Sequence, residues 1–223
     1  MICGLKRAVW IVAVCMSTTL LAFSEVKITV DHNIGDAATS EFKFRRVPAP
    51  VKDQAAFKIK PKLIVGEANP SSGGLSALTD GALPEEEDQP KGNFFFASGA
   101  DGGRFLLDLG SVIEVAQVNT YSWHPDVRAP QIYNLFVSDG STANFNPEPD
   151  ANTDPLTCGW KLIATVDTRP KQGDSGGQYG VSIADSSGSL GKIRYLLFDS
   201  IPTEDDDPWG NTFYSELNVL AKK

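Results

Sequence analysis

The stretch that decides the fold is residues 104–122, RFLLDLGSVIEVAQVNTYS. It holds two short strand candidates, Arg104–Asp108 and Glu114–Ser122, with the turn residues Gly110 and Ser111 between them. Outward from this stretch, further strand candidates are separated by clusters of Gly, Pro, Asp and Ser: Val26–Val30, Asn93–Ala97, Ile132–Ser138, Trp160–Val166, Gln178–Ile183, Ile193–Ser200 and Thr212–Leu220. Many short strands with turn signals between them are typical of a β-sandwich or barrel.

Two of these segments, and two of the connections between them, carry more specific structural predictions. Alternation in Trp160–Val166 predicts that Trp160, Leu162, Ala164 and Val166 share one face of a strand. Ile193–Phe198 is apolar on both faces, which favours a central strand. Arg46–Asp53 contains two prolines and reads as an extended connector, and Asp139–Gly159 is long enough to be a surface excursion.

The first 24 residues have the layout of a secretory signal peptide. Lys6 and Arg7 precede the apolar run Ala8–Ala22, and Ala22-Phe23-Ser24 offers small residues before a cut at Ser24/Glu25. The run is shorter than the about 20 apolar residues of a bilayer span, and we see no transmembrane segment in the mature chain. We therefore expect a secreted protein, extracellular or periplasmic; a retained anchor is the alternative.

The composition of the mature chain limits its partners. Its 199 residues carry 18 basic and 28 acidic side chains, a net charge of −10. A phosphate backbone would be repelled, so we expect no nucleic-acid partner. Cys158 is the one cysteine after residue 24, which leaves no internal disulfide. A chain of this size suits one domain that buries its own core.

Six features follow one another in an order that resembles a known family. They are Leu78-Thr79-Asp80-Gly81, the run Arg104–Gly110 ending in Asp-Leu-Gly, Val115 to Val118, Arg128 before Tyr133 and Ser138-Asp139-Gly140, Trp160, and Tyr214-Ser215-Glu216-Leu217-Asn218-Val219. This order resembles the discoidin family, also called the coagulation-factor C-type or galactose-binding-like domain, and in particular a secreted bacterial subgroup. The match runs from about Leu63 to Leu220, about 70% of the chain.

The resemblance implies a specific architecture. We expect an all-β jelly-roll β-sandwich over residues 63–223, preceded by an N-terminal arm, residues 25–62, with one or two strands. The chain departs from the family where 11 residues, Ala82 to Gly92, separate Gly81 from Asn93, and where Asn-Phe-Phe replaces the usual Thr-x-Trp.

The resemblance also implies a structural Ca²⁺ site. Related modules often hold the ion through the turn Asp, a polar side chain, the late Glu and backbone carbonyls, a set of oxygens that suits this hard cation. Carried over by position, the side-chain ligands are Asp80, Asn93 and Glu216, with carbonyls near Leu78 and Gly81. The alternative is that Asp80 caps its own turn and Glu216 pairs with a base.

In this fold the loops at one end of the barrel gather the ligand. The matching loops are 84–92, 122–130 and 203–211, and they carry four candidate ligand-binding residues: Trp123, His124, Arg128 and Trp209. Aromatic faces and charged groups are suited to sugars. The alternatives are that Arg128 pairs with an acid and that His124 satisfies a buried backbone group.

Gly173-Asp174-Ser175-Gly176-Gly177 matches the nucleophile motif of trypsin-like proteases. Such an enzyme also needs a base His in the right context, and neither His32 nor His124 has one. We therefore expect no enzyme. The favoured function is a secreted binding module for carbohydrate or cell-surface glycan. The alternative is a structural or adhesive surface protein that uses the sandwich for protein contacts.

Overall fold

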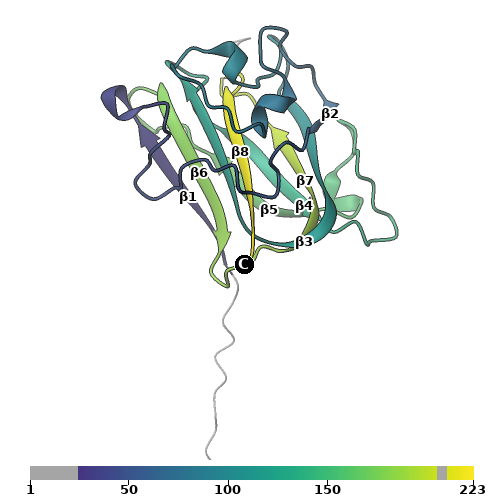
Figure 1. Cartoon of the computed structure of the whole chain (residues 1–223). Coiled ribbons are helices and arrows are strands. Elements are labelled where there is room, and N and C mark those ends of the chain that lie inside the picture. The colour runs from purple at the N-terminus through teal and green to yellow at the C-terminus, as the bar shows by residue number, and fades with distance from the viewer. Residues whose placement is uncertain (1–24, 205–209) are drawn as a thin grey trace, which may run out of the picture.

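A computed structural model describes residues 25–204 and 210–223 of the chain. In these residues the fold consists of eight strands and four short 3-10 helices (Figure 1). The strands are β1 (Val26–Asn33), β2 (Lys62–Val65), β3 (Gly103–His124), β4 (Ile132–Ser138), β5 (Lys161–Asp167), β6 (Gly177–Asp185), β7 (Gly191–Ser200) and β8 (Tyr214–Ala221). The 3-10 helices are η1 (Gly35–Ala37), η2 (Leu75–Leu78), η3 (Pro90–Gly92) and η4 (Pro155–Thr157). None of them is long and apolar enough to cross a bilayer.

The decisive stretch is one bent strand, β3, where the sequence indicated two. Its first half pairs with β2 and β7, and its second half pairs with β6 and β8. The bend lies where the register with β7 shifts, between Asp108 and Ile113. Gly110 supplies a φ of 79° there, a conformation that costs glycine little, and its N–H donates to the Asp108 carboxylate at 2.8 Å.

This bend divides the strands into two antiparallel sheets. The first sheet has the order β2-β3-β7-β4-β5 and the second has the order β1-β6-β3-β8. Their inner faces enclose the main core, in which Phe105 stacks on Phe198 with centroids 4.9 Å apart. The expected all-β sandwich is confirmed, and so is the central position of β7.

The second sheet is covered on its outer face by residues 34–61, which we call the strap. It crosses in front of β6 and β8 in Figure 1. Phe42 and Val47 of the strap pack with Tyr121 and Trp123 of β3 in a separate apolar cluster. The strap follows β1, which pairs with β6 over its whole length and so belongs to the sandwich.

Hydrogen bonds fix the strap at two places along its length. On β1, Asp31 accepts from the backbone N–H of Arg46 and Val47 and from the Arg46 guanidinium. Burial opposes ionisation of Asp31, but these bonds outweigh it and keep its pKa below the ordinary value. Farther along, the N–H of Ala55 donates to the carbonyl of Val219 on β8 at 2.8 Å.

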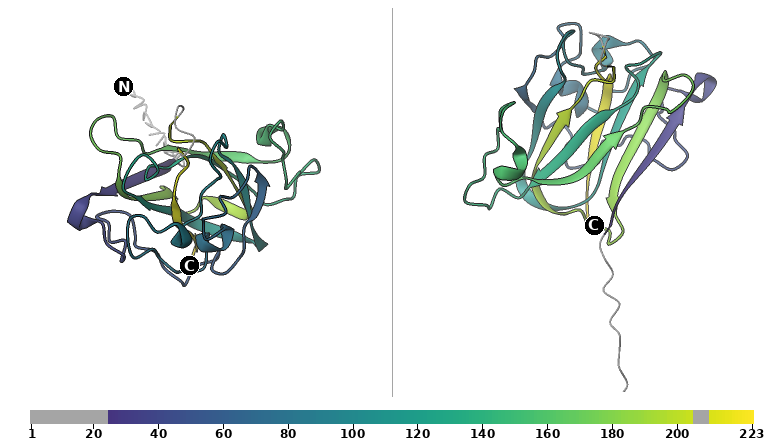
Figure 2. Two further views of the ribbon diagram at one scale, coloured as in Figure 1. Left: turned by 90° about the horizontal axis from the view of Figure 1, so that it is seen from above. Right: turned by 180° about the vertical axis from the view of Figure 1, so that it is seen from behind.

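The excursion, residues 139–160, covers the outer face of the first sheet, seen from behind in Figure 2 (right). Cys158 and Trp160 pack there with Leu106, Phe136 and Leu197. Trp160 therefore lies outside the sandwich, whereas Ala164 and Val166 point into the main core. The prediction that these side chains share one face was wrong, because a bulge shifts the register of β5 on β4.

Asn93–Ala97 is not a strand, although one was expected. Phe94 and Phe96 make isolated bridges to Tyr214 and Ala68, and both rings are buried in the main core. The apolar run was thus a correct sign of burial but not of strand pairing.

Candidate ligand-binding site at the loop end

One end of the sandwich gathers the loops that leave β3 and β7 and those that enter β4 and β8; we call it the loop end (Figure 2, left). The register sets these strand ends level, since Gly103 and Tyr133 both lie opposite Ser200. Two of the loops that the sequence indicated come into contact there, since the Nε of Arg128 donates to the carbonyl of Asn211. The N–H of Phe213 donates to the carbonyl of Arg128 at 2.9 Å.

Arg128, Phe95 and Phe213 form a stack that we call the ring cluster. The two rings are parallel with centroids 4.0 Å apart, and the guanidinium carbon of Arg128 lies 4.0 Å from the Phe213 centroid and 4.6 Å from that of Phe95. Its Nε donates to the carbonyl of Asn211 at 3.4 Å. A cation against an aromatic face contributes about 0.5–2 kcal/mol. Arg128 therefore ties the loop after β3 to the segment that enters β8.

His124 borders this cluster and is held from two sides. Its ring lies 4.4 Å from that of Phe213, and its Nδ1 lies 2.7 Å from the carboxylate of Asp126. Burial lowers the pKa of His124 below its ordinary value; the Arg128 charge lowers it further, whereas Asp126 and Asp88 raise it. Only 6% of His124 is exposed. The imidazole is therefore neutral near pH 7 and has little surface to offer a ligand.

Beside the ring cluster lies a hollow of about 560 Å³ that the sequence did not reveal. Its walls are residues 65–67 at the end of β2, residues 97–104 up to the start of β3, Ala151 of the excursion and residues 199–201. Asn211 joins the hollow to the ring cluster, because its amide also donates to the carbonyls of Ala97 and Ala100 at 3.4 Å. Hollows of this size hold small ligands in other proteins.

The hollow depends on close approach of the backbone. A Cβ at Gly102 would lie 2.0 Å from the carbonyl oxygen of Ser200, and Gly102 has a φ of 82°. Only glycine meets both conditions. The Gly102-Gly103 pair was therefore a sequence signal of a special backbone site, but nothing in the sequence said that it lined a hollow.

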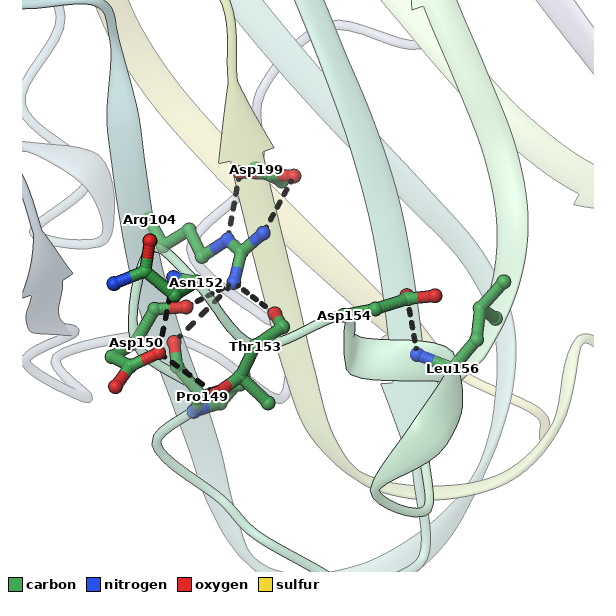
Figure 3. Close-up of polar contacts among 8 residues, drawn as sticks. All are labelled: Arg104, Pro149, Asp150, Asn152, Thr153, Asp154, Leu156 and Asp199. Atoms are coloured by element: carbon green, nitrogen blue, oxygen red, sulfur yellow. Dashed lines mark hydrogen bonds and ion pairs between the residues drawn. The ribbon is translucent and has the colours of Figure 1, made fainter.

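Arg104 is one of the residues that line the hollow, and Figure 3 shows its polar contacts. Its Nε and Nη2 donate to the two carboxylate oxygens of Asp199, at 2.9 and 3.4 Å. Its Nη1 donates to the carbonyls of Asp150 at 2.6 Å and Thr153 at 2.8 Å. The Arg104 side chain is 11% exposed. It thus holds the excursion against β7 and sets Ala151 at the edge of the hollow.

Trp123 does not line a binding surface. Its side chain lies under the strap, 5% exposed, and meets the Phe42 ring edge to face at 5.7 Å. The strap packs against the indole, so Trp123 has little surface to offer a ligand. Trp209 lies outside the residues that the structure describes.

The three proposed calcium ligands are placed differently from one another. Glu216 on β8 is 1% exposed, and its Oε2 accepts from the N–H of Gly81 at 3.0 Å. Burial raises its pKa to about 8, and the charge of nearby Asp80 contributes to this rise. Asp80 is exposed and its Oδ1 accepts from the N–H of Ala82 at 2.7 Å, so it does cap its turn. Asn93 bonds Ser215 and the carbonyl of Gln89.

A buried carboxylate beside a second one fits a cation chemically. No cluster of three or more His, Cys, Asp or Glu side chains suited to a metal occurs in residues 25–204 and 210–223. A calcium ion would therefore bind through Asp80, Glu216 and backbone carbonyls. The Asn93 oxygen already accepts from Ser215 at 2.7 Å.

The protease-like motif, residues 173–177, lies immediately before β6 and ends at its first residue. His32 comes close to it, but its Nε2 lies 2.8 Å from the Gly176 carbonyl, which can only accept. That nitrogen therefore carries a proton and is not a base for Ser175. The His32 ring stacks on Tyr179 at 4.0 Å, which gives it a packing role.

No family model matches the chain, and no curated protein matches it. Among solved structures it is similar to a fucose-binding module of Streptococcus pneumoniae, with 11% identity and a TM-score of 0.47 over 85% of this chain and 100% of the other. It is similar to the lectin domain of lectinolysin complexed with Lewis B antigen, with 10% identity and a TM-score of 0.49 over 78% and 100%. It is also similar to chitosan-binding module 1 of a chitosanase/glucanase from Paenibacillus sp. IK-5, with 16% identity and a TM-score of 0.45 over 75% and 98%. At these values we assign no family to the chain.

Proposed function

We propose that the chain is a secreted, non-catalytic module that binds carbohydrate in the hollow at the loop end. The observation that carries the proposal is the hollow itself. It is open to solvent through the exposed residues Ser98, Gly99 and Asp101 and has a polar base in Arg104 and Asp199. Shallow hollows with convergent polar groups suit ligands rich in hydroxyls.

Rigid support around the hollow favours binding over chemistry. The ring cluster and Arg104 fix its walls through side chains that are already engaged with the protein. A prearranged wall lowers the entropy lost when a ligand binds. Trp209, which follows four acidic residues and precedes Gly210 in the sequence, is proposed to add an aromatic face to this site.

A glycan array probed with residues 25–223 tests the proposal. Ala151 is exposed at the edge of the hollow, so Ala151→Trp should fill the hollow without unfolding the protein. Leu156, 56% exposed on η4, gives the matched control Leu156→Trp. We expect Ala151→Trp to abolish the signals that the parent protein and Leu156→Trp both give. An array with no signal for the parent protein, or equal signals for all three, would contradict the proposal.

A calcium ion between Asp80 and Glu216 is a second, structural proposal. It is supported by the buried Glu216 carboxylate and by the charge of Asp80 beside it. Its test is given in the Discussion.

A further inference from the structure

The charges around the hollow are negative once the ion pair between Arg104 and Asp199 is set aside. Three acidic residues line it, Glu67, Asp101 and Asp199, and Arg104 is its one basic residue among those that the structure describes. Arg104 is paired with Asp199. Glu67 and Asp101 form no ion pair within the described part of the chain, and Asp101 is exposed. Two carboxylates therefore remain for a ligand.

Arg104 does not offset them, because its charge is paired with Asp199 and each of its three nitrogens already donates to the protein. Both carboxylate oxygens of Asp199 and the carbonyls of Asp150 and Thr153 accept from its three nitrogens, as Figure 3 shows. The carbonyl of Pro149 lies 3.5 Å from Nη1 as a further acceptor. Arg104 is thus a positioning residue for the excursion. A ligand in the hollow meets acceptors and negative charge.

Two backbone N–H groups of the hollow are engaged within the protein. The N–H of Ala97 donates to the carbonyl of Glu67 at 2.8 Å and the N–H of Ala100 donates to the carbonyl of Ala97 at 3.1 Å. The hydroxyls of Ser98 and Ser200 can donate or accept. Because the acidic residues Glu67 and Asp101 have no ion pair among the described residues, a ligand that brings positive charge is favoured, and one that brings a carboxylate or sulfate is repelled.

Resting on the proposed function, we propose that the hollow is specific for sugars that carry a free, protonated amine and excludes acidic sugars. The ammonium group would pair with Asp101 and Glu67, while the ring hydroxyls would donate to Asp199 and to carbonyls of the 97–103 loop. This specificity follows from the charges of the site and adds a ligand class to the proposed binding function.

The test titrates residues 25–223 with three tetrasaccharides by isothermal titration calorimetry. They are the tetramers of glucosamine, of N-acetylglucosamine and of galacturonic acid. We expect the glucosamine tetramer to bind about tenfold more tightly than its acetylated counterpart, the scale of two partly exposed ion pairs. The galacturonic acid tetramer should not bind. The difference between the first two should shrink as salt is added, because exposed charges are screened.

Variants assign the effect to the hollow. Asp101→Asn should remove most of the preference for the amine. The control Asp36→Asn removes an exposed charge on η1 and should leave the preference intact. Equal binding of the free and acetylated tetramers, or tight binding of galacturonic acid, would overturn the inference. If array glycans bind in a way that Ala151→Trp blocks, yet amines give no advantage, the proposed function stands and the inference alone fails.

Discussion

Because Trp123 is buried under the strap, we predict that its side chain stabilises the fold, whereas the sequence suggested a ligand-binding role. The change is Trp123→Ala, made alone, with Phe42→Ala alone, and with both together. Trp123 is 5% exposed and Phe42 is 0% exposed. Truncation of a buried Trp or Phe to Ala costs about 3–5 kcal/mol, so each single variant should lose that much free energy of unfolding.

The contact between the two rings sets the size of the coupling. They meet edge to face at 5.7 Å and 88°, a geometry that adds about 0.5–1.5 kcal/mol to burial. The remaining ring also loses its packing partner when the first is removed. The double variant should therefore be less destabilised than the two single costs together, by about 1–3 kcal/mol.

Urea unfolding followed by circular dichroism measures these free energies. Leu156→Ala, at an exposed position of the excursion, serves as the control and should stay within about 0.5 kcal/mol of the parent. A Trp123→Ala variant that keeps its stability and loses glycan binding would refute the assignment of Trp123 to the core. Fully additive single costs would refute the contact with the strap.

Three further predictions concern charge and the site. Burial raises the pKa of Glu216 to about 8 from an ordinary value of 4.5, so between these pH values the folded chain holds a proton that the unfolded chain has lost. Without divalent cations, the free energy of unfolding should therefore fall as the pH rises, by up to about 1.4 kcal/mol per pH unit. Glu216→Gln should remove this dependence from thermal melts recorded at a series of pH values. If calcium binds Asp80 and Glu216, free Ca²⁺ at 100 times its dissociation constant should stabilise the fold by about 2.7 kcal/mol. A chelator should then lower the Tm of the parent protein but not that of Asp80→Ala. An unchanged Tm of the parent protein would count against the site. Trp209→Ala should weaken glycan binding about tenfold, on the scale of an aromatic contact, with little change in Tm; an unfolded variant would instead place Trp209 in the core.

The strands were predictable because their signal is local. Apolar alternation and turn residues located segments corresponding to β1, β4, β5, β6, β7 and β8 to within a few residues. Both halves of β3 were found as well, but the continuity of β3 was not, because the Gly110 turn reads as a break. The face of Trp160 was missed for a related reason, since a bulge changes the alternation that the prediction assumed.

The candidate site was harder to predict because it depends on contacts between distant segments. Placing His124 and Arg128 at one end of the sandwich needed only the strand order, and they do lie together there. The burial of Trp123 depends on residues about 80 positions earlier in the chain, which no local pattern reports. The walls of the hollow come from four segments that are distant in sequence, so no single run of residues indicates it.

The continuity of β3 has a consequence for how the molecule opens. Because one strand supplies hydrogen bonds to β2 and β7 in one sheet and to β6 and β8 in the other, neither sheet can separate from the rest without breaking the ladder of the other. Hydrogen exchange of the β3 amides should therefore require global unfolding, while the excursion and the loops exchange through local opening. A sandwich joined in this way should lose both layers in a single transition.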